Sequence, residues 1–157
     1  MTQLPDLPTM PGLTWVPFQP GHVAVMNIKA QNFQHISRAV DVMNMLEHQA
    51  RNGHAITAIL HGRPVACFGA VHIWKGVEEM WCLIEERGRK YPKTLTRAAI
   101  VYRDFRVISQ NLHRLQIIVR CVDLRAVRWG NTIGFEIEGL MKKYGPDAAD
   151  FFMMSRS

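Results

Sequence analysis

Residues 123–139, DLRAVRWGNTIGFEIEG, decide the fold that this sequence predicts. The first part, through Ala126 and Trp129, is expected to form a short helix, and Gly134-Phe135 follow it. From Phe135 onward charged and apolar residues alternate, and a period of two is typical of a strand. The stretch therefore predicts a corner between a helix and a strand that runs over 135–144.

The segments on either side of this corner predict further strands and one long helix. Downstream, Gly145-Pro146-Asp147 predicts a turn before a last strand over 150–156. Upstream, apolar and polar residues alternate over 113–122, which predicts a strand. Residues 93–111 predict an amphipathic helix. Its apolar face is expected to consist of Leu95, Ala98, Tyr102, Phe105 and Ile108.

The first half of the chain predicts a strand, two helices and two hairpins. The strand covers 13–18, and the helices cover 22–30 and 36–51, the second ending at Asn52-Gly53. The hairpins are connected by residues 61–64 and by Lys75-Gly76. This order favours an α+β (mixed α/β) fold, with a mixed sheet and one β-α-β crossover over 78–122. We expect a single domain over 13–157 after an extended lead-in over 1–12.

Composition is that of one soluble globular domain, since 48% of the 157 residues are apolar. The apolar runs are too short to cross a bilayer, and residues 1–12 lack the features of a signal peptide. Cys67, Cys82 and Cys121 lie in apolar, strand-like runs without the spacing of a metal site, which indicates buried thiols in a reducing compartment. We therefore expect a cytoplasmic protein with no metal and no membrane partner.

The net charge of +6 lies entirely in the second half of the chain. Residues 1–80 carry five Lys/Arg and five Asp/Glu, whereas residues 81–157 carry fourteen Lys/Arg and eight Asp/Glu. This asymmetry indicates a polyanionic partner, either nucleic acid or a phosphorylated cofactor. A solvated basic face is the alternative.

Residues 77–94 combine a predicted strand, a basic loop and the start of the long helix. Helix N-termini present free N–H groups that suit phosphate. Pro92 fits the first helical turn, and Thr94 is expected to cap it. The segment predicts a phosphate site, with a solvated loop before an ordinary capped helix as the alternative. The cations of the loop are Arg87, Arg89, Lys90 and Lys93.

Over residues 13–156 the element order and the basic loop resemble the GNAT superfamily of acyl-CoA-dependent N-acyltransferases. The most specific likeness is a C-terminal motif that often reads Asn, two residues, Ala, three residues, Tyr, three residues, Gly-Phe. Asp123, Ala126, Gly134 and Phe135 stand at this spacing, with Asp in place of Asn and Gly130 in place of Tyr. The closing hairpin is also similar to that of the family. More narrowly, residues 113–147 are similar to acetyltransferase-like proteins encoded by bacteriophages.

The resemblance implies a central, mostly antiparallel sheet with helices on both faces and a V-shaped opening between strands 77–84 and 114–122. The pantetheine arm of acetyl-CoA would pair with the backbone of the first strand, including Leu83 and Ile84. Its pyrophosphate would lie on loop 87–94, and Asp123 and Trp129 would lie beside the cofactor. The implied activity is transfer of an acetyl group to a primary amine of a small molecule or a protein.

Two features depart from the pattern of the family, one in the loop and one in the C-terminal motif. With Arg89 at the first position of the loop motif, Pro92 and Thr94 stand where small residues are common, and Pro92 has no N–H to donate. Gly130 stands where a tyrosine often serves as general acid, and glycine has no proton to give.

Other residues are candidates for the missing roles. Glu78 and Glu79 begin the strand beside the expected acceptor, and either is a candidate general base, although an exposed pair at a hairpin end is the plainer interpretation. Tyr144 is a candidate proton donor. His72 and Trp74 are candidates to line the acceptor pocket, with a structural histidine as the alternative.

Two further interpretations stay open. In the first, the protein keeps the acetyltransferase fold but has weak or no catalytic activity. It would then be a phage protein that acts in virion assembly or host interaction, and it would be virion-associated. Residues 124–140 can also be scanned as helix, turn and helix, which would suit DNA. Glu136 and Glu138 would then face the DNA backbone, so nucleic acid is disfavoured as a partner. The family resemblance leaves a homodimer open.

Overall fold

The computed structural model describes residues 3–26, 44, 46–48 and 50–157 of the chain. The described elements alternate between hairpins and helices in the order that the sequence predicts. Along the chain they are β1 (Leu13–Pro17), α1 (Pro20–Ala24), β2 (Gly53–Leu60), β3 (Arg63–Trp74), β4 (Val77–Ile84), the short 3₁₀ helix η2 (Gly88–Lys90), α3 (Pro92–Ser109), β5 (Arg114–Arg120), α4 (Leu124–Thr132), β6 (Glu136–Met141) and β7 (Phe151–Arg156).

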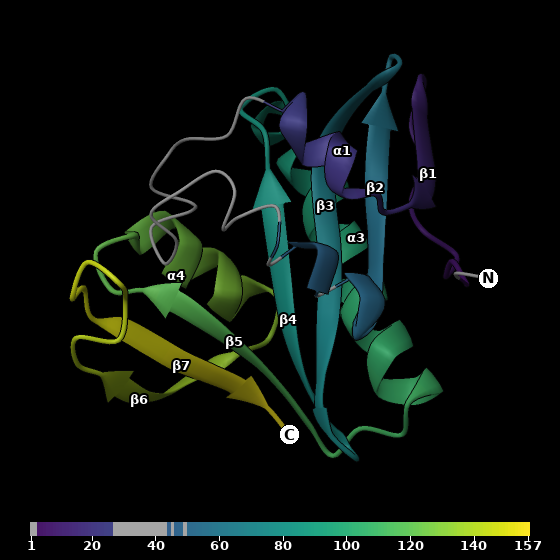
Figure 1. Ribbon diagram of the computed structural model, residues 1–157. Helices are drawn as coiled ribbons and strands as arrows, with labels where there is room; N and C mark the ends of the chain where they lie inside the picture. The colour runs from purple at the N-terminus through teal and green to yellow at the C-terminus, as the bar shows by residue number, and fades with distance from the viewer. Residues whose placement is uncertain (1–2, 27–43, 45, 49) are drawn as a thin grey trace.

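Within the described residues, seven strands form one sheet in the order β1-β2-β3-β4-β5-β7-β6 (Figure 1). Neighbouring strands are antiparallel except β4 and β5, which are parallel and are connected through α3. A parallel pair requires such a crossover, because the chain must return to the same end of the sheet. The prediction of a mixed, mostly antiparallel sheet with one β-α-β crossover is confirmed.

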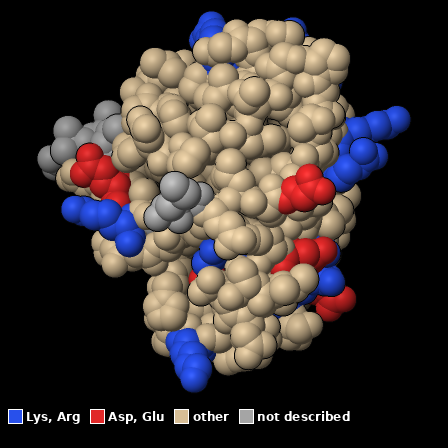
Figure 2. Space-filling view, turned by 90° about the vertical axis from the view of Figure 1, so that its right-hand side faces the viewer, with Lys and Arg blue, Asp and Glu red and all other residues tan. Residues whose placement is uncertain are grey.

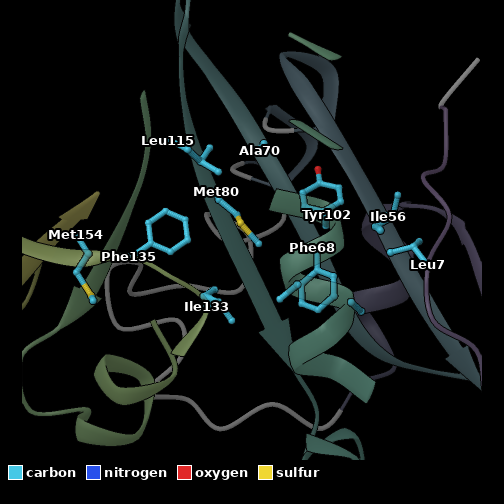
Figure 3. Close-up of a cluster of buried hydrophobic side chains, with 12 residues drawn as sticks. Leu7, Ile56, Phe68, Ala70, Met80, Tyr102, Leu115, Ile133, Phe135 and Met154 are labelled. Atoms are coloured by element: carbon cyan, nitrogen blue, oxygen red, sulfur yellow. The ribbon is translucent and has the colours of Figure 1, made fainter. Parts of the chain in front are cut away.

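Helices cover both faces of the sheet. Tyr102 of α3 lies in the largest core cluster, together with Phe68, Met80 and Leu115 from three strands of the sheet. Figure 3 shows these side chains converging between α3 and the strands. On the other face, Val23 of α1 packs in a second cluster. The helices on both faces therefore each contribute apolar side chains to a core that the sheet divides.

The helix α4 packs on the same face of the sheet as α3. The indole Nε1 of Trp129 donates a hydrogen bond to Thr96 Oγ1 of α3 at 2.9 Å, and its ring stacks on Phe68 of β3. A Cβ added at Gly130 would lie 3.0 Å from the Met154 side chain and 3.1 Å from Ile117. The absence of a side chain at residue 130 therefore lets α4 lie close to β5 and β7.

Several predicted elements differ from the structure in detail. The predicted helices over 22–30 and 36–51 extend into residues 27–43, 45 and 49, which lie outside the described residues; the described residues of 44–51 are helical. Ile108 was expected on the apolar face of α3, but its side chain is 80% exposed. Arg103 and Arg106 are buried instead, because each has an acceptor inside the fold. Lead-in residue Leu7 packs in the largest core cluster.

The interpretation of residues 124–140 as helix, turn and helix is wrong. Residues 136–141 form strand β6, which pairs with β7, as their alternating pattern predicts. Figure 2 shows the side of the molecule beyond β1, where charged residues of both signs lie scattered around a mostly uncharged centre. Over the described residues, no helix is long and apolar enough to span a membrane.

The start of α4 offers a test of the corner that decides the fold. Asp123 is the N-cap residue, and its Oδ1 accepts a hydrogen bond from Ala126 N at 3.1 Å. We expect Asp123→Ala to lower the free energy of unfolding by about 1 kcal/mol, because a free N–H replaces a capped one. Asp123→Asn keeps a capping oxygen and serves as the control in urea denaturation. Equal stability of the Ala and Asn variants would contradict this role of the cap.

Candidate functional site

A cleft opens where β4 and β5 stop pairing. The two strands pair only at Val77 with Arg114, Glu78 with Leu115, and Glu79 with Gln116. Figure 1 shows them side by side at their starts and apart toward their C-terminal ends. The cavity has a volume of about 480 Å³ and is lined by Leu46, residues 79–84, Gly88, Arg89, Pro92, Leu95, residues 117–120, Asp123, Arg125, Ala126, residues 128–130, Thr132, Ile133 and Phe151. This is the opening between strands 77–84 and 114–122 that the family resemblance implies.

The cleft is mainly apolar and carries four guanidinium groups, those of Arg89, Arg120, Arg125 and Arg128. The Nε of Arg89 is buried without a hydrogen bond among the described residues, although Glu86 Oε1 lies 3.5 Å away at ion-pair distance. A buried donor that lacks an acceptor costs free energy. The cleft is therefore suited to a ligand that is partly apolar and partly anionic.

The loop before α3 differs from a capped helix start. Pro92 is the first helical residue, no side chain caps the helix, and Leu95 N already donates to Tyr91 O at 3.1 Å. The prediction that Thr94 caps α3 is therefore wrong, because Thr94 lies inside the first turn. By helix geometry, the backbone N–H groups of Lys93 and Thr94 point out of the N-terminus, where they suit an anion.

The other predicted cations lie around the loop rather than in the cleft. Arg87 Nε forms an ion pair with Glu85 Oε1 at 3.3 Å. Lys90 and Lys93 are exposed. Their roles in binding a phosphate stay predictions, whereas Arg89 lines the cleft wall.

Glu79 lines the cleft at the point where the strands part. Its Oε1 accepts a hydrogen bond from Gln116 Nε2 at 3.0 Å, and Gln116 Oε1 accepts one from Arg114 Nε at 2.9 Å. Arg114 is held in turn by both carboxylate oxygens of Glu138, at 2.7 and 3.2 Å. Because Arg114 can only donate, it fixes the Gln116 amide with its NH₂ group toward Glu79.

Tyr144 lies near Glu79, in the connection between β6 and β7. Its ring packs edge-on against Phe151, with centroids 5.5 Å apart, and Phe151 lines the cleft. Partial burial raises the pKa of the Tyr144 phenol, and the negative charge of Glu79 raises it further. The phenol is therefore protonated at neutral pH and has a proton to give. Tyr144 is 51% exposed and is not among the residues that line the cleft, so its role as proton donor stays a prediction.

Glu78 lies on the opposite face of β4 from Glu79, because successive side chains of a strand alternate. It is 2% exposed, and its two oxygens accept hydrogen bonds from Arg106 Nε at 2.9 Å and Arg106 Nη2 at 2.8 Å. The carboxylate is thus buried in a bidentate ion pair away from the cleft. The prediction of Glu78 as an exposed candidate base is corrected to a structural residue that ties β4 to α3.

His72 and Trp74 do not line the cleft. They pair with Glu78 and Val77 at the hairpin end of β4, whereas the cleft lies toward Ile84. His72 is exposed, and Trp74 is 65% exposed. Both predictions of acceptor-lining residues are corrected for this reason.

The remaining predicted cofactor residues do line the cleft: Leu83, Ile84, Asp123 and Trp129. Beyond residue 79 the β4 backbone has no partner strand on the β5 side, so its groups are available to a ligand. Asp123 and Trp129 also have structural roles, as the cap of α4 and as its link to α3.

Sequence reasoning missed four polar residues of the site: Gln116, Arg120, Arg125 and Arg128. Arg125 and Arg128 stand three residues apart after Asp123, so helical spacing places them on one face of α4. That signal was present in the sequence. Gln116 and Arg120 carry no motif, and their positions depend on how β4 and β5 pair.

The ion pair of Glu78 and Arg106 gives a stability prediction. We expect Glu78→Gln to lower the free energy of unfolding by about 3 kcal/mol, because it leaves the buried guanidinium without a counter-charge. A double variant with Arg106→Met should recover much of the loss, and Glu79→Gln at the neighbouring residue should cost far less. Urea denaturation measures all three. A loss for Glu78→Gln no larger than that for Glu79→Gln would contradict the assignment.

The proximity of Tyr144 and Glu79 gives a titration prediction. Removing the carboxylate charge in Glu79→Gln should lower the pKa of Tyr144 toward its ordinary value, because the phenolate is then no longer repelled. The measurement is the ultraviolet difference titration between each protein and its Tyr144→Phe counterpart, which cancels Tyr91 and Tyr102. An unchanged midpoint in Glu79→Gln would show that the two groups do not interact.

No protein-family model matches the chain, and a search of curated proteins gives no match. Solved structures match over nearly the whole chain. A GNAT-family acetyltransferase from Bacillus anthracis has a TM-score of 0.70 at 14% identity, covering 92% of this chain and 94% of its own. A variant of spermidine N-acetyltransferase from Vibrio cholerae has a TM-score of 0.71 at 14% identity, covering 92% and 93%.

A third structure is a ribosomal L7/L12 alpha-N-protein acetyltransferase in complex with coenzyme A, with a TM-score of 0.67 at 13% identity, covering 96% of both chains. Such low identities show a shared fold and no more. The narrower likeness to phage proteins stays a prediction. The chain therefore has the fold of the GNAT acetyltransferases.

Proposed function

We propose that this protein is an acetyl-CoA-dependent N-acetyltransferase that acts on a primary amine. The observation that carries the proposal is the cleft between β4 and β5, which begins where pairing stops after Glu79. It offers unpaired backbone along β4, apolar walls and guanidinium groups in one opening. Three structures with this fold are acetyltransferases by name, one of them bound to coenzyme A.

The residues of the cleft fit acetyl-CoA. The β4 backbone at Leu83 and Ile84 would hold the amide groups of the pantetheine arm. The phosphates would be bound by Arg89, whose buried Nε has no hydrogen bond among the described residues, and by Arg125 and Arg128 of α4. These arginine side chains thus supply the hydrogen-bond donors that the loop backbone lacks at Pro92, which has no N–H. The cofactor supplies a thioester carbonyl to the amine.

Glu79 is the proposed general base. It takes a proton from the acceptor ammonium, either directly or through water, so that the nitrogen lone pair is free to attack. Gln116 holds its carboxylate at the mouth of the cleft through a bond of 3.0 Å. As the C–N bond forms and the C–S bond breaks, the leaving sulfur requires a proton.

Tyr144 is the proposed proton donor. Its raised pKa keeps the phenol protonated, and Phe151 holds the ring beside the cleft. It approaches from the β6–β7 connection, not from α4, where Gly130 stands. The acceptor is an amine of a small molecule or a protein, the two kinds that the names of the structural relatives mention.

A second candidate is a catalytically weak or inactive protein of this fold that acts in phage particle assembly or host interaction. The packing at Gly130 favours it, because a tyrosine there would displace Met154 and Ile117. It predicts binding of neither cofactor nor amine, or binding of cofactor without transfer.

Cofactor binding is tested by thermal shift. Saturating acetyl-CoA should raise the midpoint of unfolding by several degrees, since a ligand at about 100 times its Kd adds about 2.7 kcal/mol. Arg89→Ala should weaken binding by about tenfold, because it removes a charge-assisted hydrogen bond. Lys75→Ala, at the far end of β4, is the control for lost charge. Absence of a shift with both acetyl-CoA and CoA would rule out the proposal and favour the second candidate.

Catalysis is tested by release of free thiol over a panel of amines. Glu79→Gln should lower kcat by about a hundredfold with little change in the KM for acetyl-CoA, because a general base contributes on that scale. Tyr144→Phe should lower kcat and remove the alkaline limb of the pH profile. Turnover that is unaffected by Glu79→Gln would remove the base assignment.

A further inference from the structure

Arg120 lines the cleft with a partly buried side chain, 19% exposed, whose hydrogen bonds are incomplete. It is the last residue of β5, and its Nη2 donates to Asp147 Oδ2 at 2.7 Å. Its Nε and Nη1 are buried and have no acceptor among the described residues. Leaving buried guanidinium donors unpaired costs free energy that a ligand oxygen would recover.

Arg120 faces the same side of the sheet as the proposed base. Side chains two apart on a strand share a face, so Gln116, Ile118 and Arg120 lie on one side of β5. Gln116 on that side binds Glu79. The register partner of Arg120 is Phe151, on which Tyr144 packs. Arg120 thus belongs to the half of the cleft that holds the proposed base and acid.

The cofactor half of the cleft has its own cations. Arg125 and Arg128 belong to α4, which covers the opposite face, where Ile117 and Met154 meet Gly130. Arg89 lines the cleft from the loop before α3, the helix that packs on that same face. The phosphates of the cofactor therefore have three guanidinium groups without Arg120.

The span from Glu79 to Arg120 suits a small molecule with two charged ends. Gln116 and Arg120 are four residues apart, and a strand rises about 3.3 Å per residue, so about 13 Å of strand separates their Cα atoms. The side chains of Glu79 and Arg120 reach into the cleft, so the distance between the carboxylate and the guanidinium group is shorter than this Cα separation. Asp147, whose side chain is 44% exposed, occupies one edge of the guanidinium from the solvent side, where water weakens its hold.

We propose that Arg120 binds a carboxylate of the acceptor, so that the acceptor is an amino acid or a similar amine that carries a carboxylate. This inference rests on the proposed acetyltransferase function and names its substrate class. Glu79 receives the amine end and Arg120 the carboxylate end.

The experiment compares amines that differ only in a carboxylate at the end of the chain far from the reacting amine: lysine with cadaverine, and 6-aminohexanoate with pentylamine. Each is titrated against the CoA-bound protein by thermal shift, and kcat/KM is measured by thiol release. We expect the carboxylate-bearing member of at least one pair to bind and react about tenfold better. Arg120→Met should abolish that preference by raising the KM of the amino acid, with the KM for acetyl-CoA unchanged. Asp147→Asn, the matched control, keeps Arg120 and should keep the preference.

Three outcomes would overturn the inference. One is that both members of every pair bind and react equally well with the wild-type protein. This includes the case in which neither member changes the unfolding temperature. Another is a preference that survives Arg120→Met. A third is a higher KM for acetyl-CoA in Arg120→Met with the acceptor KM unchanged, which would assign Arg120 to the cofactor phosphate. In all three cases a thermal shift with acetyl-CoA would still support the proposed function, and its absence would remove that function instead.

Discussion

The separation of β4 and β5 after three paired residues is the constraint on which the rest of the structure depends. Parallel strands satisfy their backbone groups only with a partner, and here the partner strand turns away while both strands continue. The crossover through α3 fixes the two strands at their starts, and α4 and β7 draw β5 aside. In a continuous sheet these backbone N–H and C=O groups would form hydrogen bonds with the neighbouring strand. Here they are available to a ligand, inside a cleft whose apolar walls exclude water.

Much of this fold could be predicted because local patterns and tertiary packing agree. The alternation over 136–141 and the Asp123 cap specify the corner between α4 and β6, and the structure follows both. Ile108 is the exception. Helical spacing places Ile108 on the apolar face of α3, but its side chain is exposed near the C-terminal end of the helix. The buried positions near that end are occupied by arginines that have hydrogen-bond acceptors, such as Arg106 with Glu78. A buried ion pair gives no periodic signal in one sequence.

The candidate site was predictable in its frame and less so in its chemistry. The cleft residues Arg89, Asp123 and Trp129 carry a local pattern, whereas the link between Gln116 and Glu79 depends on the register of two strands that lie far apart in the sequence. Gly130 shows the same division. Its place in the motif indicates that the usual proton donor is missing. Only the packing shows that α4 lies too close to Met154 for a large side chain to stand at residue 130 without rearrangement.

Adjacent residues 78 and 79 have opposite surroundings because a strand alternates its side chains. Glu78 is constrained by Arg106, and Glu79 by Gln116. In the evolution of this fold, a change at 78 would require compensation from α3, whereas a change at 79 would leave the fold intact and remove the proposed base. Two neighbouring codons would then be constrained for different reasons, one by folding and the other by chemistry.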